Sequence, residues 1–162
     1  MERGVISIGA NLGDRRAALQ GAVDALASTE GLRVLAVSDP VETEPVGGPD
    51  QPKYLNAIVL VETVLDPHAV LARTQEIEAA WGRTRDVRWG PRTLDVDLID
   101  FGVVHDDDVL TLPHPRARER AFVLVPWLQV DPKAVLTGTG ALADLDIDST
   151  GVRPSTEHLD LP

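Results

Sequence analysis

The sequence predicts an α+β fold, a ferredoxin-like sandwich with a mostly antiparallel sheet, helices packed on it and an added hairpin. Apolar strand patterns and amphipathic helix patterns follow one another as β-α-β and then again as β-α-β. A strand-turn-strand pattern and a helical C-terminal part come after them. A split β-α-β order of this kind gives an antiparallel sheet with its helices on one face.

The first β-α-β unit starts near the N-terminus. Residues 4–9 (GVISIG) are apolar and end in glycine, which predicts a buried strand. Asp14 can cap a helix whose apolar positions recur at three- and four-residue spacing, and Gly31 is predicted to end that helix. These apolar positions are Leu19, Val23 and Leu26. Residues 32–38 (LRVLAVS) alternate as a strand does.

The second unit begins with residues 54–64 (YLNAIVLVETV), the strongest strand pattern in the chain. Asp66 followed by Pro67 predicts a helix start, because proline suits the first helical position. The helix is expected to continue to about Ala80, and residues 93–101 predict the strand that follows.

Two long polar loops interrupt these elements, at residues 43–53 and 81–92. Loops of this length inside a domain are usually functional. We expect both to close over a bound substrate and exclude water.

The C-terminal part is less regular. Residues 103–104 and 109–111 flank an acidic HDDD turn and predict a hairpin. Residues 121–130 are apolar, but Pro126 predicts that they do not form one continuous helix. Residues 137–162 form a tail in which only a strand or a short helix is expected.

Composition favours one domain, residues 1–162, without disulfides, because the chain has 162 residues and no cysteine. The net charge of −11 argues against nonspecific binding to nucleic acid. No run of residues is apolar enough for a membrane helix, and the N-terminal residues do not resemble a signal peptide. We expect a cytoplasmic protein that acts as a monomer on small molecules, without a nucleic-acid or membrane partner.

Asp95 and Asp97 stand two apart on the predicted strand 93–101, so both carboxylates point to the same face. The apolar residues between and beside them, Leu94, Val96 and Leu98, then face the core. Two close carboxylates repel each other unless a cation lies between them, and magnesium prefers carboxylate and phosphate oxygens. The alternative, which is the commoner case for an Asp-x-Asp pair taken alone, is a solvent-facing strand with scattered acids.

Arginines crowd the loop before this strand. They are Arg83, Arg85, Arg88 and Arg92. Guanidinium groups bind phosphate oxygens in bidentate fashion, so a magnesium-bound triphosphate would satisfy both the arginines and the carboxylates. A solvated basic loop is the alternative. His114 between two prolines is equally compatible with a phosphate contact and with a structural role.

Several segments together resemble the 6-hydroxymethyl-7,8-dihydropterin pyrophosphokinase family, from about Ile6 to Pro132. These segments are ISIGANLGD, ETEPVGG, DQPKYLNAIV, QEIEAAWGRTR, RWGPRTLDVDLIDFG and LPHPRARERAFVL. WGPRTLDVDL is the most specific of them.

The resemblance implies an enzyme of folate synthesis that transfers pyrophosphate from ATP to the 6-hydroxymethyl oxygen of the dihydropterin and releases AMP. It implies a catalytic set of Arg83, Arg92, Asp95 and Asp97, in which the two aspartates bind two magnesium ions. It further implies ATP contacts from Gln75, Glu78, Arg83, Arg85, Arg92, His114 and Arg120. The implied pterin contacts are Thr43, Pro45, Val46, Tyr54, Asn56, Trp89 and Phe122, with Tyr54 and Phe122 on the two sides of the ring.

Two other functions are compatible with parts of the pattern. A different magnesium-dependent nucleotidyl- or phosphotransferase would use the same aspartate pair but release ADP or free pyrophosphate. A non-catalytic nucleotide-binding module would bind without needing metal, and it would leave the aspartate pair unexplained.

Overall fold

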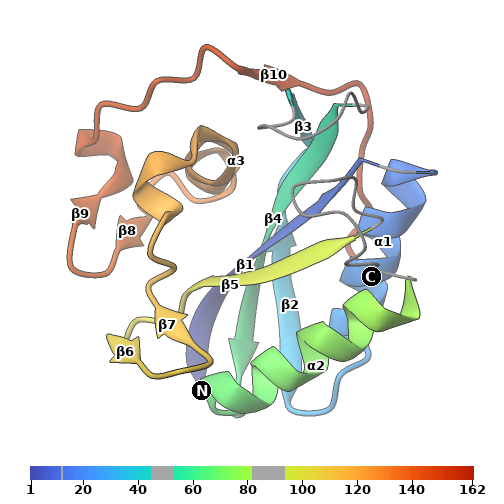
Figure 1. The fold of residues 1–162 in the computed structure, drawn as a ribbon, viewed down its shortest axis with the longest axis vertical. Coiled ribbons are helices and arrows are strands. Elements are labelled where there is room, and N and C mark those ends of the chain that lie inside the picture. The colour runs from blue at the N-terminus through green and yellow to red at the C-terminus, as the bar shows by residue number, and fades with distance from the viewer. Residues whose placement is uncertain (12, 45–52, 82–93) are drawn as a thin grey trace.

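The computed structural model describes residues 1–11, 13–44, 53–81 and 94–162. Within these ranges an antiparallel sheet carries helices on both faces (Figure 1). Its elements are β1 Glu2–Ala10, α1 Arg15–Ala27, β2 Leu32–Val37, β3 Val41–Thr43, β4 Tyr54–Thr63, α2 Pro67–Ala80, β5 Asp95–Asp100, β6 His105–Asp106, β7 Thr111–Leu112, η1 Ala117–Glu119, α3 Ala121–Val130, β8 Val135–Leu136, β9 Gly140–Ala141, η2 Leu142–Asp144 and β10 Val152–Pro154.

Strand β4 is the centre of the sheet. One edge of β4 pairs with β1 along the whole of that strand. The other edge of β4 pairs with β3 near its start and with β2 further along. β5 extends the sheet beyond β1, and β10 extends it beyond β3. All these pairings are antiparallel, so the predicted α+β class and antiparallel sheet are confirmed.

Both predicted helix starts are confirmed by their caps. The Asp14 carboxylate accepts from the N–H of Ala17 at 3.0 Å, and the Asp66 carboxylate accepts from that of Ala69 at 3.1 Å. Such caps satisfy N–H groups that have no partner inside the helix. α1 ends at Ala27, four residues before the glycine predicted to end it, and Gly31 instead takes a positive φ of 84° in the turn into β2.

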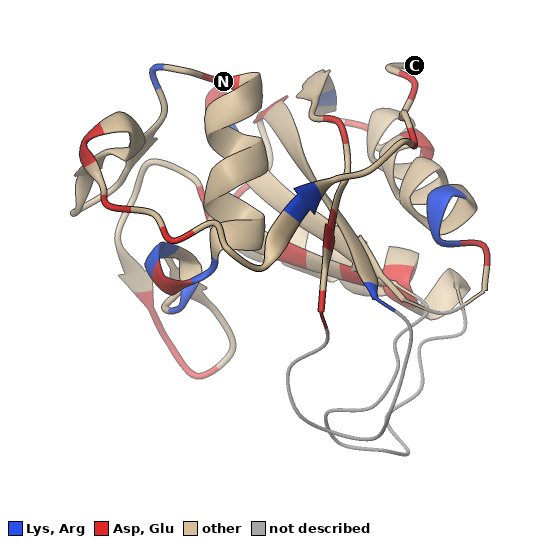
Figure 2. Cartoon of the chain, turned by 90° about the horizontal axis from the view of Figure 1, so that it is seen from above, with Lys and Arg blue, Asp and Glu red and all other residues tan. Residues whose placement is uncertain are grey.

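The two faces of the sheet bury separate cores. Ile6, Ile8 and Leu55 lie in the core under α1 and α2, whereas Ile58 and Ile99 lie in the core under α3. Figure 2 shows α3 and α1 on opposite sides of the sheet. The prediction that the helices pack on one face of the sheet is therefore correct for α1 and α2. Helix α3 forms a further layer on the opposite face of the sheet.

Helix α3 corrects the prediction made for residues 121–130. It runs through Pro126 without a break, from Ala121 to Val130. Proline inside a helix destabilises the folded state by roughly 3 kcal/mol, but burying one large apolar side chain stabilises it by about 1.5–3 kcal/mol. Val123, Leu124 and Trp127 are all at most 2% exposed, so tertiary packing outweighs the local penalty.

The remaining elements begin or end a few residues away from the predicted boundaries. The predicted loop 43–53 starts inside a strand, because Thr43 is the last residue of β3. The hairpin is present, but its paired residues are His105–Asp106 and Thr111–Leu112, slightly further along the chain than predicted. The tail contains both the expected kinds of element, and its β10 joins the main sheet. Among the described residues, no helix is long and apolar enough to cross a membrane.

Candidate functional site

One end of the sheet brings residues of three strands into a single row, with a fourth strand beside it. Asn56 lies opposite Gly9, Gly9 lies opposite Asp95, and Thr43 lies beside them opposite Tyr54. Directly paired residues point to the same face of a sheet. This face is the one that also carries α3, because the intervening residues of β1, β4 and β5 enter the core under α1 and α2. The row therefore gathers polar side chains at one edge of the α3 layer.

The aspartate pair has the predicted arrangement. Val96 and Leu98 are 3% and 4% exposed in the core, and Leu94 is fully buried there. Asp95 and Asp97 are partly exposed on the opposite face. The prediction that both acids share one face of β5 is confirmed. Their carboxylate oxygens are hard donors of the kind that magnesium prefers, so the donor set fits that ion.

Asn56 is fixed in this row by its neighbours. Its side-chain N–H donates to the Thr43 hydroxyl oxygen at 3.0 Å, and the two residues are only 4% and 8% exposed. A Cβ on Gly9 would lie 2.5 Å from the Asn56 side-chain oxygen, closer than real Cβ contacts. Gly9 is thus required for the Asn56 amide to occupy its place. The sequence pattern identifies Gly9 only as the end of a strand, because its contact with Asn56 arises from pairing across the sheet.

His114 reaches the site from the segment between β7 and α3. Its backbone N–H donates to the Ile99 carbonyl at 2.7 Å, and its Nδ1 accepts from the N–H of Arg116 at 3.1 Å. Burial, opposed by the charge of Asp97 and assisted by the charges of Arg120 and Arg116, lowers the pKa of His114. In the neutral ring, with Nδ1 accepting, the proton is assigned to Nε2, which can donate to an anionic ligand.

Arg120 and Phe122 meet at the start of α3. Arg120 is the residue before the helix, with an extended backbone, and its guanidinium carbon lies 5.6 Å from the centroid of the Phe122 ring. That separation is within the range of a cation–π interaction. Tyr54, at the start of β4, and Phe122 are both partly buried.

The two predicted residues of α2 differ in their surroundings. Glu78 is 6% exposed, and its carboxylate accepts from the N–H of Val96 at 2.9 Å. This bond joins α2 to the strand that carries the aspartate pair. Gln75, one turn earlier on the helix, is exposed.

Several predicted site residues lie outside the described residues, so their placement stays a prediction. They are Pro45, Val46, Arg83, Arg85, Trp89 and Arg92.

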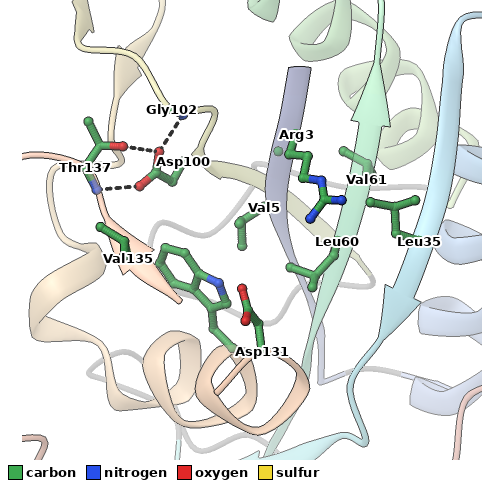
Figure 3. Close-up of a pocket in the computed structure, with 12 residues that line it drawn as sticks. Arg3, Val5, Leu35, Leu60, Val61, Asp100, Gly102, Asp131, Val135 and Thr137 are labelled. Atoms are coloured by element: carbon green, nitrogen blue, oxygen red, sulfur yellow. Dashed lines mark hydrogen bonds between the residues drawn. The ribbon is translucent and has the colours of Figure 1, made fainter. Parts of the chain in front are cut away.

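A pocket of about 310 Å³ lies elsewhere, beside the first residues of β1 and the end of α3 (Figure 3). Arg3, Trp127 and Asp131 are among the residues that line it. Asp100 also borders it, but its carboxylate accepts from the N–H and hydroxyl of Thr137 at 2.7 and 2.8 Å and from the N–H of Gly102 at 2.7 Å. The pocket is about 20 Å along β1 from Gly9, given roughly 3.3 Å per residue, and the described residues that line it include no predicted site residue.

Comparisons with known proteins agree on one family. The family model of 7,8-dihydro-6-hydroxymethylpterin-pyrophosphokinase (HPPK) matches residues 5–132. The chain is 47% identical over 150 residues to the 2-amino-4-hydroxy-6-hydroxymethyldihydropteridine pyrophosphokinase of Methylorubrum extorquens, covering 90% of this chain and 95% of that one. It is 49% identical over 158 residues to the same-named protein of Mycobacterium leprae, covering 90% of this chain and 81% of that one.

Solved structures support the fold. The chain is similar to the crystal structure of wild-type Plasmodium falciparum HPPK-DHPS with pteroate, with a TM-score of 0.64 at 14% identity. The match covers 88% of this chain but only 41% of that one, so this chain spans about two-fifths of the HPPK-DHPS chain.

Proposed function

The chain belongs to the 7,8-dihydro-6-hydroxymethylpterin-pyrophosphokinase family, and from that premise we infer that it transfers pyrophosphate from ATP to 6-hydroxymethyl-7,8-dihydropterin in folate biosynthesis. The products are the pterin diphosphate and AMP. The observation that carries this proposal is the match of the family model over residues 5–132, which contain the aspartate pair of β5 and the residues of the row beside it.

Asn56, Thr43 and Tyr54 are proposed to bind the pterin. The Asn56 amide is buried and fixed by its bond to Thr43, so it can present hydrogen-bonding atoms in a constant orientation to the edge of a heterocycle. Tyr54 from β4 and Phe122 from α3 supply the flat apolar surfaces on which the ring stacks. Pro45, Val46 and Trp89 belong to this proposal by resemblance alone.

Asp95 and Asp97 are proposed to hold two magnesium ions. When bound, magnesium neutralises charge on the ATP phosphates and lowers the pKa of the attacking hydroxyl group. The two carboxylates lie on one strand whose position is braced by the bond from the Val96 N–H to Glu78, so they enter the site from a rigid element. Arg83 and Arg92 are proposed to share the phosphate charge with them.

His114 and Arg120 are proposed to contact ATP. The lowered pKa of His114 keeps its ring neutral at pH 7, and the Nε2–H group then donates without adding charge. Arg120 brings a permanent positive charge to the same segment. Gln75, Glu78 and Arg85 complete the proposed ATP contacts.

The transfer itself joins the pterin hydroxymethyl oxygen to the β-phosphorus of ATP. The bond between that phosphorus and the oxygen bridging to the α-phosphorus breaks, AMP leaves with this oxygen, and the hydroxyl proton is lost. Transfers of this type depend on positioning and charge neutralisation more than on covalent catalysis. The row of Asn56, Gly9 and Asp95 supports this, because the amide proposed to bind the pterin lies on the same face as the carboxylates proposed to bind metal.

The test is to incubate the purified chain with ATP, magnesium and 6-hydroxymethyl-7,8-dihydropterin and to identify the products by mass spectrometry. We expect equal amounts of AMP and pterin diphosphate, and no product when a chelator removes the metal. Formation of ADP or of free pyrophosphate would instead indicate a different transferase. Nucleotide binding without turnover would indicate a non-catalytic module.

A further inference from the structure

Three possible metal ligands meet on the surface between α2 and the β6–β7 hairpin. His68 lies in the first turn of α2, and His105 and Asp107 belong to the hairpin. Nε2 of His68 and Nε2 of His105 lie 2.7 and 2.6 Å from the same oxygen of Asp107, Oδ2, and 3.2 Å from each other. His68 is about 15 Å along α2 from Glu78, given roughly 1.5 Å per residue, so this cluster is separate from the proposed pyrophosphokinase site.

Protons alone do not satisfy all three contacts. If both nitrogens carry hydrogens that point at Oδ2, the 3.2 Å contact joins two donors. If one nitrogen loses its hydrogen to accept from the other, its lone pair faces the carboxylate oxygen at 2.6 or 2.7 Å. A cation between the three atoms would instead receive a lone pair from each of them.

The rest of the cluster holds these atoms in place. The other Asp107 oxygen, Oδ1, accepts from the N–H groups of Val109 and Leu110 at 2.8 and 2.9 Å, which leaves Oδ2 directed at the histidines. The two imidazole rings meet edge to face, with centroids 5.1 Å apart. Bonds that orient a ligating carboxylate in this way are typical of metal sites and raise their affinity.

We propose that His68, His105 and Asp107 bind one divalent transition-metal ion of the zinc class. Zinc–nitrogen and zinc–oxygen bonds of about 2.0–2.2 Å place tetrahedral ligands roughly 3.3–3.5 Å apart. The two nitrogens are already close to that spacing, and the oxygen has to move outward by roughly 0.6–0.9 Å. Imidazole ligands favour zinc, copper and nickel over magnesium, and the 37–44% exposure of these side chains leaves a position for water.

The bound ion would add a surface cross-link between two elements that also contribute to one core, in which Leu110, Leu112 and Val70 are buried. The β6–β7 hairpin has only two paired residues in each strand, and isolated hairpins of that size are marginal in water. Through His68 the ion would attach this hairpin to α2. Its consequence is therefore stability of the hairpin, not chemistry.

The experiment measures zinc binding to the purified, metal-free chain by isothermal titration calorimetry, with magnesium in large excess to occupy oxygen-rich sites. We expect the wild-type chain to bind one more zinc ion than His68→Ala and Asp107→Asn do. Asp107→Asn keeps an oxygen for the Val109 and Leu110 N–H groups, and His68 is an exposed helical residue, so both variants should remain folded. Equal stoichiometry in all three proteins overturns the proposal.

His158→Ala is the matched control. His158 is also exposed and also faces one carboxylate, Asp39 at 3.3 Å, but the structure places no second histidine within its described contacts. We expect this variant to bind zinc as the wild type does. Zinc at about 100 times its dissociation constant should raise the melting temperature of the wild type and of His158→Ala by roughly 5–10 °C. The same rise in His68→Ala would show that the ion binds elsewhere.

Cobalt provides an independent readout. Bound to two imidazoles and a carboxylate in tetrahedral geometry, Co²⁺ is expected to give intense visible absorption in the wild type and none in His68→Ala. A weak octahedral spectrum that is identical in both proteins would contradict the assignment.

Discussion

Replacing Gly9 with alanine should weaken pterin binding without touching any group that is proposed to contact ATP. The added Cβ would lie 2.5 Å from the Asn56 side-chain oxygen, and that oxygen must move by about 0.9 Å to reach the 3.4 Å of ordinary contact. Such a shift breaks the 3.0 Å bond from Asn56 to Thr43. The displaced amide of the buried Asn56 then no longer pairs with the edge of the pterin, and a polar group left without its partner in the complex costs about 1–3 kcal/mol of binding free energy.

This energy corresponds to a loss of pterin affinity of roughly 5- to 150-fold, at 1.4 kcal/mol for each factor of ten. The assay is titration calorimetry with the pterin and, separately, with a non-hydrolysable ATP analogue. We expect the dissociation constant of the pterin to rise within that range and that of the nucleotide to stay within about twofold, the scatter expected for an independent site.

The matched control is Gly4→Ala on the same strand. Its Cβ would lie 2.3 Å from the Phe101 ring, in the core under α1 and α2 and at the other end of β1. This variant should lower the melting temperature while leaving the ratio of pterin affinity to nucleotide affinity unchanged.

A double-mutant cycle separates the steric cause from general damage. In an Asn56→Ala background the new methyl group has room, so Gly9→Ala should cause almost no further loss of pterin affinity. If Gly9→Ala weakens pterin binding equally in both backgrounds, contact with Asn56 is not the cause and the reasoning is refuted.

Four further predictions concern the site and its support. Asp97→Ala should reduce turnover by roughly 100-fold or more, the usual effect of removing one preorganised charge from an active site. Its melting temperature should change little, because Asp97 is partly exposed. Near-normal turnover with magnesium would rule out the metal assignment. Tyr54→Ala should weaken pterin binding by roughly 2- to 12-fold, the scale of one aromatic pair, and ATP-analogue binding less, so equal losses measured by calorimetry would count against stacking. Because the pKa of His114 is lowered in the folded chain, the unfolded chain takes up this proton first as the pH falls through about 6.5, and the folded state loses stability there. Urea unfolding without ligands from pH 7 to about pH 5 should therefore show a smaller loss in His114→Gln than in the wild type or in His158→Gln, and identical curves would contradict this. Glu78→Ala should lower the free energy of unfolding by about 1.5–3 kcal/mol, because the buried Val96 N–H loses its acceptor. Glu78→Gln keeps an oxygen at that position and should recover most of this loss. If urea unfolding shows no difference between the two variants, this hydrogen bond does not contribute as argued.

The sequence predicted those features of the site that depend on local periodicity. Asp95 and Asp97 share a face because alternation along one strand is a property of the strand alone. The caps at Asp14 and Asp66 are equally local, since each involves only the next three residues.

Features that depend on distant partners could not be predicted in this way. Gly9 acquires its role from Asn56 on another strand, and β3 is a strand because it pairs with β4 and β10. The helix through Pro126 was predicted wrongly, because a local rule cannot weigh the burial of Trp127 and its neighbours. The placement of Arg83 and Arg92 relative to the aspartates remains a prediction from resemblance.

The central position of β4 has a kinetic consequence. The row of Asn56, Gly9 and Asp95, with Thr43 beside it, exists only after β4 has paired on both edges and β5 has joined β1. Pairings between segments so far apart along the chain form slowly, because loop closure must precede them. A chain whose sheet is incomplete is therefore expected to lack both the proposed pterin site and the proposed magnesium site, so substrate would bind only to chains with the complete sheet.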